Sequence, residues 1–134
     1  MKQQKAGGQS KEQSKSPVPL PYRPEQDKKD WPVTLLIASY ANGNLVVVLQ
    51  TDTEGVPQDF ATITVNFPDE QLLPDQAYLD INNVPGIEQF VREHQLAKPN
   101  GREKISGYCT YPLYTFDLDR CMEHGSSVNP LVAS

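Results

Sequence analysis

Two runs of β-branched and aliphatic residues, at 33–40 and 44–50, open the regular part of the sequence. Between them lies Asn42-Gly43, a pair typical of a hairpin because a type I′ turn requires positive φ at both central residues. The second run is apolar on both faces, which predicts a strand in the middle of a sheet. Residues 60–67 then alternate between apolar and polar positions, as a half-buried strand does. The face expected to be buried carries Ala61, Ile63, Val65 and Phe67. We therefore expect three antiparallel strands in sequential order.

The second half of the chain predicts two more strands and one helix. Residues 77–81 and 108–118 have β character, and a helical pattern lies between them. Pro85 suits the first position of this helix, which we expect to run to about Leu96 and to stop before Pro99-Asn100-Gly101. Its apolar stripe has the spacing i, i+3, i+4, i+7. The stripe consists of Ile87, Phe90, Val91 and His94.

These elements together predict the α+β class, with an antiparallel β-meander of four to five strands packed against one amphipathic helix. A chain of 134 residues suits one domain of this kind. We place the compact domain at residues 31–122 and expect residues 123–134 to be a flexible C-terminus.

Composition changes near Trp31. Residues 1–30 carry seven basic and four acidic side chains, a net charge of +3, whereas the other 104 residues carry five basic and thirteen acidic, a net charge of −8. A segment so rich in Pro, Gln, Lys and Ser buries too little to offset its ordering entropy, so we predict a disordered tail with polyproline II character at 17–24. Pro21-Tyr22-Arg23-Pro24 matches a PxxP pattern, although a solvated linker is the favoured interpretation. The positive charge of the tail could also attract it to nucleic acid or to the acidic body of its own domain.

Composition also narrows the class of protein. The longest apolar runs fall far short of the roughly 20 residues that a membrane helix needs, and no apolar region follows the N-terminal lysines as a signal peptide would require. The two cysteines are too few for a disulfide scaffold or a thiolate zinc site. We expect a cytoplasmic protein without a cofactor and without membrane association.

Few residues suggest catalysis. His94 and His124 have neither of the common metal-binding spacings, and Cys109 and Cys121 are too far apart for a CxxC pair. Cys109 is expected to be a small buried hydrophobe. The alternative is a thiol-dependent hydrolase in which His94 or Asp117 activates Cys109. The sequence contains no glycine-rich phosphate loop and no G-x-S-x-G elbow, so a protein that is not an enzyme is favoured.

Tyrosines are concentrated near the last predicted strand, where Tyr108, Tyr111 and Tyr114 recur every three residues. Exposed tyrosines are typical of recognition surfaces, and together with Asp117 and Asp119 they form the candidate interaction surface. For Tyr111 and Tyr114, packing at the edge and in the core of the sheet is the favoured interpretation. Direct nucleic-acid binding by the folded domain is disfavoured, because its net negative charge repels phosphates.

Three segments, at 39–45, 61–68 and 107–114, resemble in order and spacing the bacterial domain-of-unknown-function family 4313. The resemblance covers roughly residues 31–118. It implies a small cytoplasmic protein encoded on a conjugative or phage-like element of gut bacteria, and it supplies no catalytic residues. We therefore expect a binding or modulator protein whose partner is a host or element-encoded protein. A specific version is an inhibitor of a host nucleic-acid-binding defence protein, in which the acidic surface competes for a basic groove.

Overall fold

The strands of this protein form two sheets, as a computed structural model shows for residues 17–24, 29–53 and 56–127. The first sheet has the order β10 (Gly125–Ser127), β3 (Trp31–Ser39), β4 (Leu45–Thr53), β5 (Val56–Thr62), and β2 (Leu20–Tyr22) also pairs with β3. The second has the order β6 (Thr64–Val65), β7 (Gln76–Leu79), β9 (Cys109–Phe116), β8 (Ala97–Ser106). Two helices, α1 (Ile87–Glu93) and α2 (Leu118–Glu123), complete the described part.

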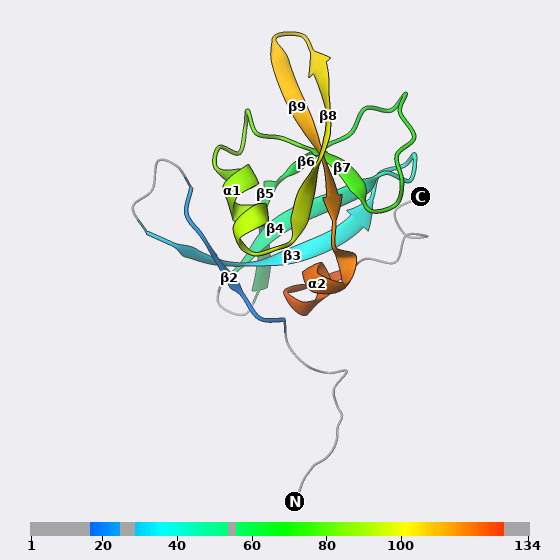
Figure 1. The fold of residues 1–134 in the computed structure, drawn as a ribbon. Coiled ribbons are helices and arrows are strands. Elements are labelled where there is room, and N and C mark those ends of the chain that lie inside the picture. The colour runs from blue at the N-terminus through cyan, green and yellow to red at the C-terminus, as the bar shows by residue number, and fades with distance from the viewer. Residues whose placement is uncertain (1–16, 25–28, 54–55, 128–134) are drawn as a thin grey trace, which may run out of the picture.

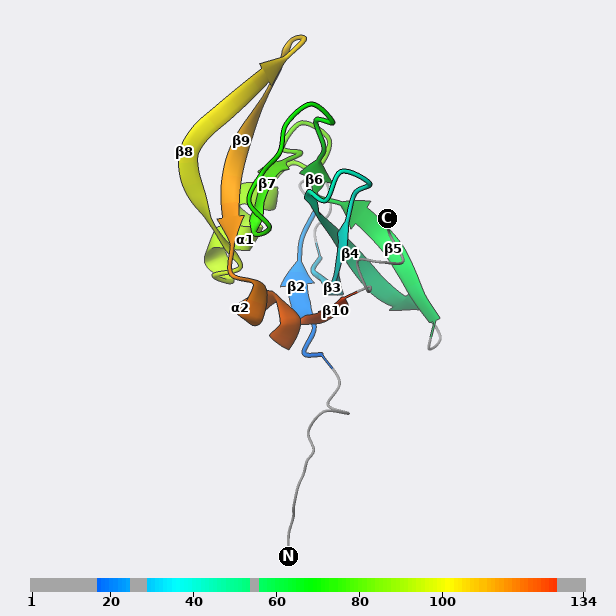
Figure 2. The same ribbon diagram turned by 90° about the vertical axis from the view of Figure 1, so that its right-hand side faces the viewer.

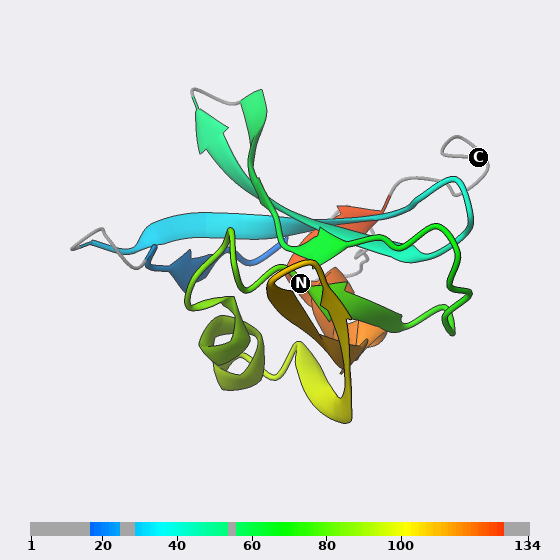
Figure 3. The ribbon, with the colours of Figure 1, turned by 90° about the horizontal axis from the view of Figure 1, so that it is seen from above.

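The sheets lie against each other and enclose one hydrophobic core (Figure 2). Seen from above, α1 and the second sheet lie on the same side of β3 (Figure 3). The α+β class and the mainly antiparallel pairing are confirmed. The predicted meander is formed by β3, β4 and β5, and β6 to β9 form a second sheet that the prediction did not separate.

Ile63 is the point at which the chain changes sheets. Its N–H donates to the Val47 carbonyl of the first sheet (3.0 Å), and its carbonyl accepts from the Asp80 N–H beside β7 (2.9 Å). The predicted strand 60–67 is therefore divided into β5 and β6. Its alternation fails at Thr64, which was expected on the wet face but is buried with its hydroxyl oxygen accepting from the Val47 N–H (3.2 Å).

The hairpin of β3 and β4 is confirmed, and β4 lies between β3 and β5 as predicted. The turn is not type I′. The Gly43 N–H donates to the Tyr40 carbonyl (2.8 Å), so the central residues are Ala41 and Asn42, neither of which has positive φ, and the positive φ (91°) falls on Gly43 after them. The Asn42 side chain instead donates to the carbonyls of Pro68 and Glu70 (both 3.4 Å), so contacts with a distant loop decide this turn.

The predicted face of α1 is confirmed, with Ile87, Phe90 and Val91 buried. The helix is shorter than expected, and the residues after it form β8 rather than a turn region. The sequence of β8 has no alternation of apolar and polar residues that could have predicted a strand, and Ala97 is its only buried residue. Pairing with β9 forms the strand, and a register shift between Pro99 and Glu103 accommodates the turn-like residues.

The prediction of disorder before Trp31 is wrong for the described residues of that segment. β2 pairs antiparallel with the start of β3, and Leu20 and Tyr22 are buried in the core. The Tyr22 ring meets the rings of Phe90 and Phe60 edge-on, at centroid distances of 5.2 and 5.8 Å. Burial of the Leu20 and Tyr22 side chains holds this segment against the core, although its prolines predicted polyproline II. Residues 1–16 and 25–28 lie outside the described residues.

The C-terminal segment also differs from its prediction, because α2 and β10 occupy residues 118–127. β10 pairs parallel to β3, with Gly125 opposite Leu35. A Cβ on Gly125 would lie 2.0 Å from the Leu35 carbonyl oxygen, so only glycine fits this approach. His124 is buried, with its Nδ1 2.8 Å from the Val18 carbonyl oxygen. Residues 128–134 lie outside the described residues.

Candidate functional site

A long hairpin, formed by β8 and β9 and called here the arm, projects from the body of the protein (Figure 1). At its foot Ala97 pairs with Phe116, and at its tip Ser106 pairs with Cys109. β7 pairs with β9 only at residues 113–115, so the outer half of the arm has no neighbouring strand among the described residues. The edges of this outer half are therefore unpaired among the described strands.

The tip of the arm exposes two large side chains. Tyr108 is fully exposed in the turn that follows Gly107, and Ile105 is 71 % exposed on β8. The turn needs Gly107 because its φ is +63°. Single exposed apolar residues are ordinary, but here two of them lie within three residues at the end of a projecting element. The tip is therefore the part of the arm where two large side chains are exposed close together.

An aromatic and charged cluster braces the arm where it leaves the body. The Phe67 ring meets the rings of Tyr78 and Tyr111 at 5.3 and 5.5 Å, and the Lys104 ammonium lies 5.1 Å from its centroid. Lys104 and the Tyr78 hydroxyl also donate to the two carboxylate oxygens of Glu70 (2.5 and 2.8 Å). These hydrogen bonds hold the pKa of Glu70 below its ordinary value. The cluster fixes the direction of the arm.

Charge is unevenly distributed along the folded chain. Residues 31–91 carry eight acidic side chains and neither lysine nor arginine. The five basic residues of 31–134 belong to α1, β8 and α2. They are Arg92, Lys98, Arg102, Lys104 and Arg120. The arm, with three basic side chains and one acidic, is thus the cationic part of an acidic folded chain, whereas α1 and α2 each carry two acidic side chains and one basic.

The structure does not bring the predicted interaction residues together as one surface. Tyr108 is at the tip, Tyr111 packs on Phe67, and Asp117 and Asp119 lie beyond the foot of the arm at the start of α2. Tyr114 is fully buried, so its place on an exposed surface is wrong. Burial and the hydrogen bond that its hydroxyl donates to Glu88 (2.6 Å) raise the pKa of Tyr114 to about 12.

The cysteines lack the surroundings of a nucleophile. Cys109 is half-buried rather than buried as expected, and it lies near the tip of the arm, whereas His94 and Asp117 lie near its foot. The seven residue steps from Cys109 to the end of β9 span roughly 23 Å at about 3.3 Å per residue, so neither group can activate its thiol. Cys121 is buried, and burial raises the pKa of its thiol to about 12. The hydrolase alternative therefore receives no support from this geometry.

Sequence reasoning found Tyr108 but missed Ile105, Lys98, Arg102 and Lys104. The absence of lysine and arginine from residues 31–91 could have shown that the basic residues of the folded part are concentrated after residue 91. Nothing in the sequence distinguished Ile105 from a core residue. Among the described residues, no group of three His, Cys, Asp or Glu side chains is placed to hold a metal ion. Neither described helix has the length and apolar character needed to span a membrane.

The fold and the arm define a small α+β domain with an exposed hairpin tip and no catalytic constellation among its described residues. The sequence matches the family described as "Domain of unknown function (DUF4313)" over residues 34–130, and the chain belongs to this family. The resemblance seen in the sequence is thereby confirmed. Comparisons with curated proteins and with solved structures find no match.

Proposed function

We propose that this protein acts without catalysis, by binding another protein through the tip of the arm. The observation that carries the proposal is the fully exposed Tyr108 beside the exposed Ile105 on a hairpin that extends beyond the body. Neither side chain stabilises the core of the domain. Tyrosine is among the residues that contribute most binding energy when a partner buries them, because its ring is large and rigid.

The arm is built to dock by its side chains rather than by adding a strand. β8 is the outer strand of its sheet, and a free edge of this kind invites pairing with other chains. Pro99, the adjoining register shift, and lysines along β8 all oppose such pairing. The partner that fits is a protein with an apolar recess for Tyr108 and an acidic rim that faces Arg102.

A more specific form of this proposal, called here the finer version, concerns the activity of the partner protein. The resemblance to the family supports a gene on a bacterial mobile element and a host or element-encoded partner. The acidic stretch 31–91 supports a partner that itself binds nucleic acid, because an acidic surface competes with nucleic acid for a basic groove. We therefore propose inhibition of a host defence protein of that class.

The arm is tested by comparing four full-length proteins as baits in lysate of a bacterial host: wild type, Tyr108→Ser, the double variant with Ile105→Ser, and Leu73→Ser. Leu73 is a matched control, because it is 62 % exposed and lies just before β7, which pairs only with the inner half of the arm and not with its tip. We expect one protein to be retained by the wild type and Leu73→Ser, and to be lost from both arm variants. Equal retention by all four, or by none, would refute contact through the tip.

The finer version is tested on the retained protein. We expect duplex DNA or RNA to displace it from the bait, and we expect binding to weaken as salt screens the acidic surface. A partner that neither nucleic acid displaces would remove the competition mechanism and leave the contact at the arm unaffected.

A further inference from the structure

A second feature lies at the foot of the arm, on the side opposite its tip. Here the end of α1, the start of β8 and the start of α2 surround an open hollow of about 720 Å³. Pockets of roughly 300–1,000 Å³ are the usual size for small organic ligands. The lining combines the buried apolar residues Ala97 and Phe116, called here the floor, with polar and charged side chains.

Three of the five basic side chains in residues 31–134 line this hollow, one from each surrounding element. Arg92 comes from α1 and lies beside the Tyr114 hydroxyl, Lys98 comes from β8, and Arg120 comes from α2. Lys98 forms no ion pair with any described residue. The three cations come from separate elements and converge on one hollow, although the folded part carries a net negative charge.

Backbone contacts hold the three elements in place. α1 ends in a Schellman motif: the Leu96 N–H donates to the Val91 carbonyl (2.8 Å), and the Gln95 N–H donates to the Arg92 carbonyl (3.1 Å). The Asp117 N–H then donates to the Leu96 carbonyl (2.8 Å), which joins the start of α2 to the same turn. The hollow is therefore preformed, and its cations do not depend on a loop closing over the ligand.

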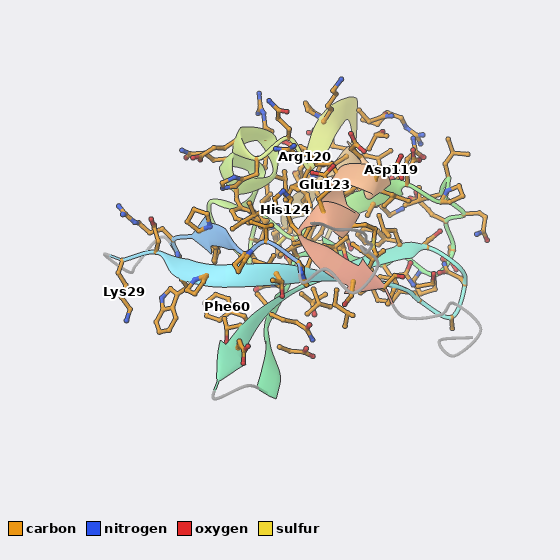
Figure 4. All side chains as sticks on the ribbon, turned by 90° about the horizontal axis from the view of Figure 1, so that it is seen from below. Lys29, Phe60, Asp119, Arg120, Glu123 and His124 are labelled. Carbon is orange, nitrogen blue, oxygen red and sulfur yellow. The ribbon has the colours of Figure 1, made fainter. Side chains whose placement is uncertain are left out.

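Arg120 shows how the cations are oriented. It lies on the side of α2 that faces α1 (Figure 4), and its Nε donates to the His94 carbonyl (3.2 Å). Its Nη1 lies 3.7 Å from the Glu123 Oε1, an exposed pair of small energetic weight. The carboxylate in the lining is Asp117, whose Oδ1 accepts from the Arg120 N–H (3.1 Å) as the cap of α2. The lining of the hollow thus holds three cations and one carboxylate, and Glu123 outside the lining is a weak partner of Arg120.

We propose that this hollow binds the phosphate group of a small organic phosphate. Guanidinium groups match phosphate oxygens with paired, charge-assisted hydrogen bonds, and the Lys98 ammonium adds a mobile point charge. The apolar floor and the volume leave room for the organic part of the ligand. The site is separate from the tip of the arm, so the proposal does not rest on the proposed protein contact.

The probe is AMP, titrated by calorimetry into the full-length protein, with adenosine and succinate as comparisons. Adenosine lacks the phosphate, and succinate carries a similar charge on carboxylates. Lys98→Gln and Arg92→Gln remove cations from the hollow, whereas Arg102→Gln removes the same charge from a part of β8 that does not line it. Unfolding midpoints of all three variants identify any that fail to fold, and Lys98 is exposed, so at least its variant should fold.

We expect saturable AMP binding that weakens about tenfold in Lys98→Gln and in Arg92→Gln, and less than about twofold in Arg102→Gln. We expect neither adenosine nor succinate to bind comparably. The proposal is overturned if AMP gives no saturation up to about 10 mM, if adenosine or succinate binds as tightly, or if Arg102→Gln has the same effect as the variants in the hollow.

Discussion

Tyr22→Ala tests whether the segment before Trp31 belongs to the folded domain. Tyr22 is 4 % exposed, and its ring contacts the rings of Phe60 and Phe90 edge-on. Removing a buried aromatic ring costs about 3–5 kcal/mol, to which each ring pair contributes about 0.5–1.5 kcal/mol. Because β2 is short and pairs only with β3 among the described strands, we expect the lower end of that range, about 3 kcal/mol.

The free energy of unfolding is measured at pH 7 by urea titration, with Trp31 as the reporter. Trp31 is the only tryptophan of the chain, and its ring lies 6.0 Å from that of Phe60, so unfolding changes its surroundings. The expected loss corresponds to a fall of about 10 °C in Tm. A chain that begins at Trp31 lacks both Leu20 and Tyr22 and should be destabilised further.

Val18→Ala is the control, because Val18 lies in the same segment with its side chain 56 % exposed. Its hydrogen bond to Glu123 uses the backbone N–H and survives the substitution. We expect a loss below about 0.5 kcal/mol. A loss below about 1 kcal/mol for Tyr22→Ala, or equal losses for the two variants, would show that β2 is not part of the core.

Three further predictions concern single residues. Gln95→Gly should raise the free energy of unfolding by about 0.5–1 kcal/mol in urea titrations, because Gln95 has a φ of 60° that glycine adopts at little cost; an unchanged value would contradict this. Hydrogen bonds from Lys104 and a tyrosine lower the folded-state pKa of Glu70 below 4.5, so their stabilisation is present above pH 4.5 and is lost as pH falls through the lowered pKa. Urea titrations of Glu70→Gln across that range should show a weaker dependence on acid than wild type, and equal slopes would refute the coupling. An aromatic disulfide reagent should label Cys109 in the native protein and Cys121 only in urea, because burial raises the pKa of Cys121 to about 12; rapid native labelling of both would contradict the packing.

Local patterns predicted those elements in which one face of a strand or helix is buried. The runs of 33–40 and 44–50 became β3 and β4, and Ile87, Phe90 and Val91 became the buried face of α1. In such elements the spacing of apolar residues records which side meets the core, so the chain alone carries the information.

Only the tertiary structure decided the elements whose stability comes from a partner. β8 is almost wholly exposed, β2 lies among prolines, and β10 forms because Gly125 lets its backbone approach Leu35. None of these has a periodic apolar pattern of its own. The change of sheet at Ile63 likewise depends on hydrogen bonds to residues far away in the sequence.

The same distinction between local sequence and tertiary structure applies to the arm and to the hollow. The sequence by itself determined that tyrosines gather around the last long strand, that the folded part is acidic, and that its few cations come late in the chain. Tertiary structure decided that Tyr108 is exposed while Tyr114 is buried, and that Arg92, Lys98 and Arg120 surround one hollow. Residue type sets what a side chain can do, but exposure and convergence depend on how separate elements pack, and no local pattern records that packing.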